Sequence, residues 1–142
     1  MLFGKRERAI KRVLIAEDEP LVAFDNEHSL RDAGYMVVAT VDSVPAAVAR
    51  IAGGRIDLVL SDVNLSDGGD GRDVARAAKA HGVPLLFVTG ACPADARALA
   101  IGCLLKPYGP RDLLAAIEAV EATLAGRAPR RRPRGLMLFD RE

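Results

Sequence analysis

Acidic, hydroxyl and ammonium side chains follow four short apolar runs of the 142-residue chain. These groups are Glu17-Asp18-Glu19, Ser61-Asp62, Thr89-Gly90 and Lys106-Pro107. Carboxylates gathered at one place raise one another's pKa unless a cation neutralises them. Mg²⁺ suits such oxygen ligands, a lysine suits an anionic phosphoryl oxygen, and a threonine adds a hydroxyl donor. Together these residue types indicate phosphoryl transfer.

A carboxylate is the expected acceptor of the phosphoryl group. The chain lacks GxxxxGK[ST] and GxGxxG, the glycine-rich motifs that cradle nucleotide phosphates. The donor is therefore expected to be small or carried by a protein. A phosphatase of the haloacid-dehalogenase kind is disfavoured, because such enzymes usually need a second Asp two residues after the nucleophile. That position is Asn64, which cannot protonate a leaving group.

Alternating strands and helices must position these groups. Short apolar runs, typical of strands buried on both faces, occupy residues 13–16, 36–40, 56–60, 85–88 and 103–105. Helical patterns cover residues 20–33, 43–52, 71–80, 93–100 and 109–125. This order predicts an α/β fold, a doubly wound five-stranded parallel sheet of (βα)5 type. Ligand chemistry in such a fold lies at the C-terminal ends of the strands, where the chemical groups of this chain lie.

Several helix ends have recognisable signals. Ser43 and Asp70 are expected to cap the N-termini of the second and third helices. Pro45 fits within the first turn of the second helix, where its missing N–H costs nothing. Gly34 and Gly82 are expected to end the first and third helices.

Charge is distributed unevenly, although the formal net charge is +1. Residues 1–12 and residues 127–142 each carry +4, whereas residues 13–126 carry −7. A nucleic-acid-binding domain would be expected to carry basic residues on its folded face, which this acidic body does not offer. The basic tail could still bind an acidic partner, a nucleic acid or the acidic body itself.

Membrane insertion and secretion are not expected. No apolar run approaches the roughly 20 residues that span a bilayer, and the N-terminus lacks the apolar region of a secretion signal. The two cysteines, Cys92 and Cys103, are too few for a disulfide framework. Cys103 is expected to be a buried packing residue, and a cytoplasmic, reducing compartment fits best.

Four segments in order resemble the response-regulator receiver domain of two-component signalling: VLIAEDEP, IDLVLSDVNL, PLLFVTGA and LLKPY. The resemblance covers about residues 11–125 and implies a flavodoxin-like sheet with strand order 2-1-3-4-5. It leaves residues 1–10 as a basic N-terminal extension. Residues 126–142 remain as an Arg/Pro-rich C-terminal tail with a short apolar plug at 136–139, which could pack on its own domain or add to a neighbour.

The resemblance implies a magnesium site and a phospho-acceptor. Asp62 would accept the phosphoryl group. Asp18 would bind Mg²⁺ directly, Asp62 would also bind it, and Glu17 would act through water. The backbone carbonyl of Asn64 would complete the protein ligands.

The resemblance also implies how the phosphoryl group is recognised. Thr89 would bind a phosphoryl oxygen, Lys106 would pair with the phosphoryl group, and the Lys106–Pro107 bond is expected to be cis. Most receivers place an aromatic switch residue three positions before the lysine, and here that residue is Cys103. This departure, together with PLLFVTG, is similar to stand-alone receivers served by histidine kinases of the HWE/HisKA2 type.

The expected function is that of a single-domain response regulator. It would accept a phosphoryl group from a histidine kinase or phosphotransfer protein and signal through protein–protein contact or phosphorelay to an output protein that the sequence does not name. No DNA-binding domain is expected, and no enzymatic activity beyond its own aspartyl phosphorylation and dephosphorylation. A phosphorylation-independent adaptor and a phosphate sink are the alternatives.

Overall fold

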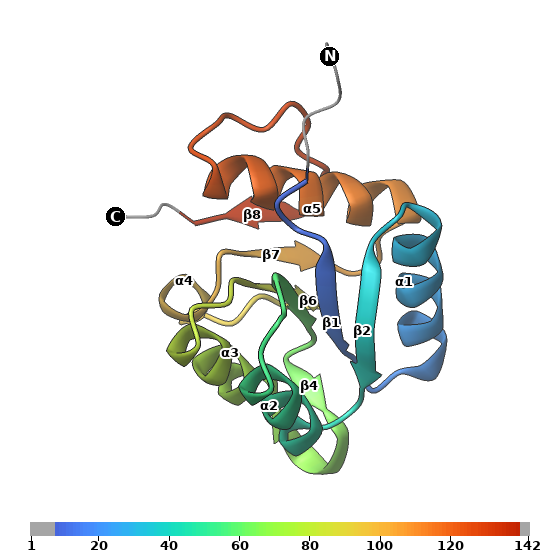
Figure 1. The fold of residues 1–142 in the computed structure, drawn as a ribbon, viewed down its shortest axis with the longest axis vertical. Helices are drawn as coiled ribbons and strands as arrows, with labels where there is room; N and C mark the ends of the chain where they lie inside the picture. The colour runs from blue at the N-terminus through green and yellow to red at the C-terminus, as the bar shows by residue number, and fades with distance from the viewer. Residues whose placement is uncertain (1–7, 140–142) are drawn as a thin grey trace.

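The computed structural model describes residues 8–139, in which helices cover both faces of a central sheet (Figure 1). The strands of this sheet are β1 (Arg12–Ala16), β2 (Met36–Val41), β3 (Leu58–Ser61), β6 (Leu85–Thr89), β7 (Gly102–Leu105) and β8 (Leu136–Leu138). The helices are α1 (Pro20–Asp32), α2 (Val44–Ala52), α3 (Gly71–Ala80), α4 (Ala96–Leu99) and α5 (Pro110–Leu124). Residues 1–7 of the basic extension and residues 140–142 of the tail lie outside the described residues.

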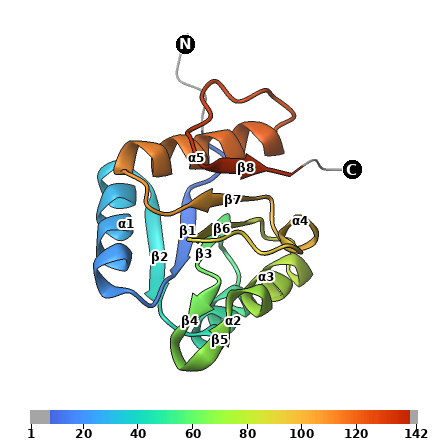
Figure 2. The ribbon, with the colours of Figure 1, turned by 180° about the vertical axis from the view of Figure 1, so that it is seen from behind.

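The strand order confirms the flavodoxin-like fold. Five strands run parallel in the order β2-β1-β3-β6-β7, which is the predicted order 2-1-3-4-5. After β3 the chain makes a small antiparallel pair, β4 (Asn64–Leu65) and β5 (Gly69–Asp70), joined by the single 3-10 turn η1 (Ser66–Gly68). This pair lies below the main sheet, beside α2 (Figure 2).

Alternate residues of each strand enter two separate cores. Ile15, Leu60 and Val88 face the side covered by α1 and α5. On the opposite side Val59 and Phe87 pack with α2, α3 and α4. Because the central strands β1, β3 and β6 are buried on both faces, they must lie between two helix layers. Its register is therefore fixed, since a shift by one residue would exchange the two faces.

The predicted helix signals are confirmed. The Ser43 hydroxyl accepts a hydrogen bond from the amide of Ala46 at 3.3 Å. The carboxylate of Asp70 accepts one from the amide of Arg72 at 2.9 Å. Gly34 follows α1 with φ at +96°, and Gly82 follows α3 with φ at +71°, conformations that suit glycine.

The fourth helix is shorter than predicted. The sequence pattern extended it over 93–100, whereas α4 spans Ala96–Leu99. Backbone bonds from Ala96 to Pro93 and from Ala98 to Asp95 show that the preceding residues form tight turns instead. Asp95 also gives no side-chain cap, so the segment lacks the starting signal that extends a helix.

The C-terminal tail contributes a strand that the sequence did not predict. Leu136–Leu138 form β8, which pairs antiparallel with β7, so the apolar plug packs on its own domain. Backbone bonds flank this pairing, from Leu105 to Gly135 at 3.0 Å and from Phe139 to Ile101 at 2.9 Å. Three residues after an Arg/Pro run carry too short a pattern to be read as a strand.

The two cysteines form a bond that the sequence did not predict. Cys103 is fully buried, as expected, but it forms a disulfide with Cys92. Their spacing gave no signal of this bond, because the pairing depends on β7 lying beside β6 and on the loop that follows β6. Within residues 8–139, no helix has the length and apolar character needed to cross a membrane.

Gly102→Ala should weaken the attachment of β8. A Cβ at this position would collide with the carbonyl oxygen of Met137 in β8. Overpacking of this kind typically costs about 1–3 kcal/mol. Thermal unfolding should shift down, and the amide of Phe139 should exchange faster with solvent. Gly90→Ala is the control, because nothing lies within 4 Å of its Cβ position; equal effects from both variants would contradict the proposed tight contact.

Candidate functional site

Asp62 lies directly after β3, at the C-terminal edge of the sheet. Its amide bonds to the carbonyl of Ala16 at 2.9 Å, which continues the pairing of β3 with β1. Its Oδ1 accepts hydrogen bonds from the amides of Val63 at 2.6 Å and Asn64 at 3.3 Å. The residue is only 5% exposed, so these bonds fix the carboxylate in one orientation.

Gly71 allows α3 to begin against the backbone of Asp62. Its amide donates to the carbonyl of Val63 at 2.6 Å. A Cβ on Gly71 would collide with the carbonyl oxygen of Asp62, so a glycine is needed at this point. The sequence offered no sign of this requirement, because it comes from a contact between α3 and the end of β3.

Two acidic residues from the end of β1 join Asp62. Carboxylate oxygens of Glu17, Asp18 and Asp62 all lie within 4.8 Å of one another. The β1–β3 register explains the arrangement, because Ala16 pairs with Ser61 and the next residues continue side by side. The structure therefore brings together the three predicted carboxylates.

Lys106 reaches these carboxylates from the end of β7. Its Nζ lies 2.8 Å from Oδ2 of Asp62 and 3.0 Å from Oε1 of Glu17. The exposed Glu19 is the most distant of its partners, at 3.6 Å. Burial lowers the pKa of the ammonium, but its hydrogen bond to Asp62 and its ion pair with Glu17 outweigh that effect and hold the pKa above its ordinary value. Lys106 is therefore a fixed positive charge at neutral pH.

Glu17 is the most deeply placed acid of the group. Its side chain is fully buried, and burial raises its pKa although Lys106 and the amide of Glu19 partly oppose this. Its Oε1 lies near the Lys106 ammonium but makes no hydrogen bond of good geometry. A buried carboxylate oxygen without a hydrogen bond, next to two further carboxylates, fits a hard divalent cation that takes oxygen ligands.

Thr89 lies at the end of β6, beside Lys106. The Lys106 amide donates to the Thr89 carbonyl at 2.9 Å, so the two strand ends are in register. The Thr89 hydroxyl donates to the carbonyl of Ala91 at 3.2 Å and accepts from the amide of Ala91 at 3.3 Å. In this structure the Thr89 hydroxyl, which is predicted to bind a phosphoryl oxygen, is instead hydrogen-bonded within its own loop.

Tyr108 and Asn26 support the site without having been predicted to do so. The Lys106–Pro107 bond is cis, as predicted. The Tyr108 hydroxyl that follows it donates to Oδ1 of buried Asn26 in α1 at 3.0 Å. This bond joins the loop that carries Lys106 to the helix that follows the acidic pair. The sequence signal that could have indicated this bond is Asn26 itself, a polar residue that interrupts the apolar face of the first helix.

Asn64 lies on the surface in β4, two residues after Asp62. Its amide contributes to the hydrogen bonds around Asp62. The metal-binding role of its carbonyl stays a prediction.

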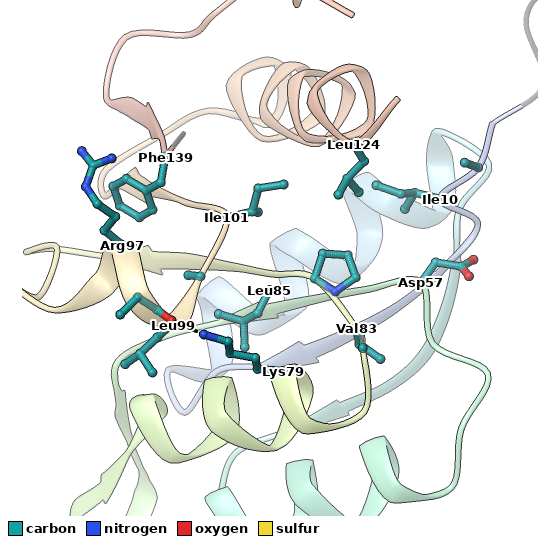
Figure 3. A pocket seen from close by; sticks show the side chains of 15 residues that line it. Ile10, Asp57, Lys79, Val83, Leu85, Arg97, Leu99, Ile101, Leu124 and Phe139 are labelled. Atoms are coloured by element: carbon teal, nitrogen blue, oxygen red, sulfur yellow. Dashed lines mark hydrogen bonds between the residues drawn. The ribbon is translucent and has the colours of Figure 1, made fainter. Parts of the chain in front are cut away.

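A separate hollow of about 560 Å³ lies at the opposite end of the strands (Figure 3). Its lining includes Asp57, Val83 and Ile101, which precede β3, β6 and β7. None of the predicted site residues lines it. The chemistry predicted from the sequence therefore belongs to the acidic edge alone.

Comparisons with known proteins agree with this arrangement. The sequence profile of the family "Response regulator receiver domain" matches residues 13–118. The chain is 37% identical over 114 residues to the transcriptional regulatory protein PdtaR of Mycobacterium tuberculosis, a match covering 76% of this chain and 55% of that protein. It is 34% identical over 116 residues to the phyllosphere-induced regulator PhyR of Methylorubrum extorquens, covering 74% of this chain and 41% of that protein. The chain thus spans about half the length of the curated relatives it matches.

Solved structures share the fold. SdrG of Sphingomonas melonis Fr1 superposes with a TM-score of 0.70 at 35% identity, over 80% of this chain and 98% of that one. A CheY-like receiver domain protein of Methanospirillum hungatei JF-1 gives 0.73 at 26% identity, over 83% of this chain and 98% of that one.

Glu17→Gln should stabilise the fold at neutral pH. Because the folded-state pKa of Glu17 is raised, stability from this group is present below its unfolded pKa and is lost as pH rises through the folded value. A neutral amide removes the buried charge, while Lys106 keeps its bond to Asp62. We expect a gain on the order of 1 kcal/mol, or about 4 °C in Tm.

The gain should shrink as the pH is lowered and the native Glu17 becomes protonated. Glu19→Gln is the matched control, because the side chain of Glu19 is 58% exposed and its charge is solvated. Thermal unfolding between acidic and neutral pH measures both variants. A lower Tm for Glu17→Gln at neutral pH would show that the Lys106 pairing outweighs the burial of the charge.

Proposed function

Since the chain belongs to the response regulator receiver domain family, we propose that it is a phosphoryl-accepting signalling protein in which Asp62 is the acceptor. The observation that carries this proposal is the position of the Asp62 carboxylate, 2.8 Å from the Lys106 ammonium and grouped with two further acids. Oδ1 is held by backbone amides. A fixed carboxylate of this kind can attack a phosphorus atom, and the ammonium beside it can neutralise the phosphoryl oxygens.

We propose Mg²⁺ as the cation of this site. Glu17, Asp18 and Asp62 supply the carboxylates, and the backbone carbonyl of Asn64 is the proposed further ligand. When bound, Mg²⁺ would neutralise negative charge on the phosphoryl oxygens. Lys106 supplies positive charge from the other side of Asp62, and Glu17 keeps Lys106 directed toward it.

The proposed donor is a phosphohistidine of a histidine kinase, of the HWE/HisKA2 type, or of a phosphotransfer protein. Exposed apolar residues next to the acidic edge support a protein donor. Leu21 and Phe24, in the first turns of α1, are 78% and 68% exposed. They follow the acidic pair directly in the chain, so a protein that contacts them could present its phosphohistidine to Asp62.

The proposed output is contact with another protein in the cytoplasm, or transfer of the phosphoryl group along a relay. The hydrogen bonds between the Thr89 hydroxyl and the backbone of Ala91 favour a switch. Binding a phosphoryl oxygen would require the hydroxyl to give up these bonds. A phosphate sink needs the same acceptor but no such rearrangement. An adaptor that works without phosphorylation needs neither the acceptor nor the rearrangement.

Phosphoramidate, a small donor with a P–N bond, tests the acceptor. With Mg²⁺ present the wild-type chain should gain one phosphoryl group, which intact mass spectrometry detects, and Asp62→Asn should gain none. Asp67→Asn is the matched control, because Asp67 lies exposed in the nearby η1 turn. Its φ of +59° also suits asparagine. Equal phosphorylation of wild type and Asp62→Asn would contradict the proposal that Asp62 is the acceptor.

Beryllofluoride, a phosphoryl mimic, separates the switch from the sink. If the chain is a switch, amide NMR shifts with Mg²⁺ and the mimic should extend from Asp62 through Thr89 to α4 and β7. Shifts confined to the residues around Asp62 would favour a sink. Failure of both Mg²⁺ and the mimic to bind would favour the adaptor.

A further inference from the structure

The disulfide between Cys92 and Cys103 joins the loop after β6 to strand β7. The Cα atoms are 6.1 Å apart, within the ordinary range for a disulfide. The bond closes a ring with a sequence separation of 11, which contains the whole of α4. The bond therefore constrains residues 92–103, the segment that contains the short helix α4.

The two cysteine residues differ in their exposure to solvent. Cys103 is 0% exposed and packs beside Phe87, Ala96 and Phe139. Cys92 lies in the loop and is only partly buried. Cys92 is therefore the more exposed of the two residues to a thiolate from solution, while Cys103 is shielded by the core.

The bond lies between two elements of the acidic edge. Cys92 comes three residues after Thr89, and Cys103 comes three residues before Lys106. The Thr89 hydroxyl is already engaged by Ala91, inside the same loop. Turning this hydroxyl toward Asp62 breaks its two bonds to Ala91, and the disulfide holds Cys92, the residue after Ala91, against β7.

Other contacts also hold this segment: Ala96 is buried in the core, and Arg72 in α3 forms an ion pair with Asp95 at 3.5 Å. Lys79 in α3 donates to the carbonyl of Ala98 at 2.9 Å. The Arg97 guanidinium lies 5.3 Å from the ring centre of Phe139, and Figure 3 shows the two side chains next to each other. Because a one-turn helix has little stability of its own, its position depends on these contacts and on the covalent bond that closes the segment.

We propose that Cys92 and Cys103 form a reversible dithiol–disulfide site, reduced by a dithiol, that sets the freedom of the β6–α4 loop and through it the readiness of Thr89 to engage a phosphoryl group. The part concerning Thr89 rests on the proposed function. The site itself rests on the bond and on the different exposure of its two cysteine residues.

The dithiol reductant supplies the electrons and hydrogens that the exchange reaction needs. A thiolate of the dithiol attacks Sγ of Cys92, the bond to Cys103 breaks, and the Cys103 thiolate takes up a proton. The second thiol of the reductant then displaces Cys92, which is protonated in turn. The protein gains two electrons and two hydrogens, and the dithiol becomes a disulfide.

The first test needs no phosphorylation. The full chain is purified without reductant, one half is treated with dithiothreitol, and both are alkylated and weighed. We expect no alkylation of the untreated form and two alkyl groups on the treated form. Amide exchange of residues 90–101 should then be about tenfold faster after reduction, with α2 unchanged. Two free thiols in the untreated form, or equal exchange in both forms, would overturn the site.

Cys92→Ser is the matched variant, because it removes the bond at the partly exposed residue and leaves the buried Cys103 in place. It should exchange like the reduced wild type, whether or not dithiothreitol is present. A Cys92→Ser variant that keeps the slow exchange of the oxidised form would show that the bond does not hold the loop.

The second test addresses Thr89. Phosphoramidate with Mg²⁺ is applied to the oxidised and reduced forms, and we expect severalfold faster phosphorylation of the reduced form. Equal rates would overturn the coupling to Thr89 while leaving the redox site. If neither form is phosphorylated but the exchange difference persists, the proposed function fails and the redox site stands.

Discussion

The ammonium of Lys106, held between the carboxylates of Asp62 and Glu17, is the interaction on which the acidic edge depends. Without it, buried negative charges from β1 and β3 would face one another with no compensation, and burial alone raises the pKa of Glu17. The ammonium neutralises part of this charge and leaves room for a cation. The buried charges of this site therefore lower the stability of the fold, as is common at functional sites.

The sheet makes this balance possible by fixing which strand ends are neighbours. β1 and β3 are paired in register, so Glu17 and Asp62 continue the pairing of Ala16 and Ser61. β6 and β7 bring Thr89 and Lys106 together in the same way. Burial of the central strands on both faces opposes a shift of register, because a shift would move core side chains to the wrong helix layer. Packing far from the acids thus determines the distances between them.

Features set by local sequence or by strand order could be predicted. The five parallel strands, the caps of α2 and α3 and the approach of Asp62, Glu17, Asp18 and Lys106 follow from apolar runs, capping residues and the rule that chemistry lies at strand ends. Features set by distant pairing could not. The bond between Cys92 and Cys103 and the strand β8 require β7 and its neighbours to be in place first. Gly71 shows the same limit, since its backbone neighbour Asp62 lies nine positions earlier in the sequence.

Strand β8 also changes how the sheet ends. Without it, β7 would present a free row of backbone donors and acceptors, a template for pairing with other chains. β8 covers that row, and Gly102 lets it approach closely. The new border is only three residues long and follows a run rich in arginine and proline. A short border next to repelling charges is a poor template for sheet extension, so the tail protects the β7 side of the sheet, opposite the edge strand β2, against edge-to-edge self-association.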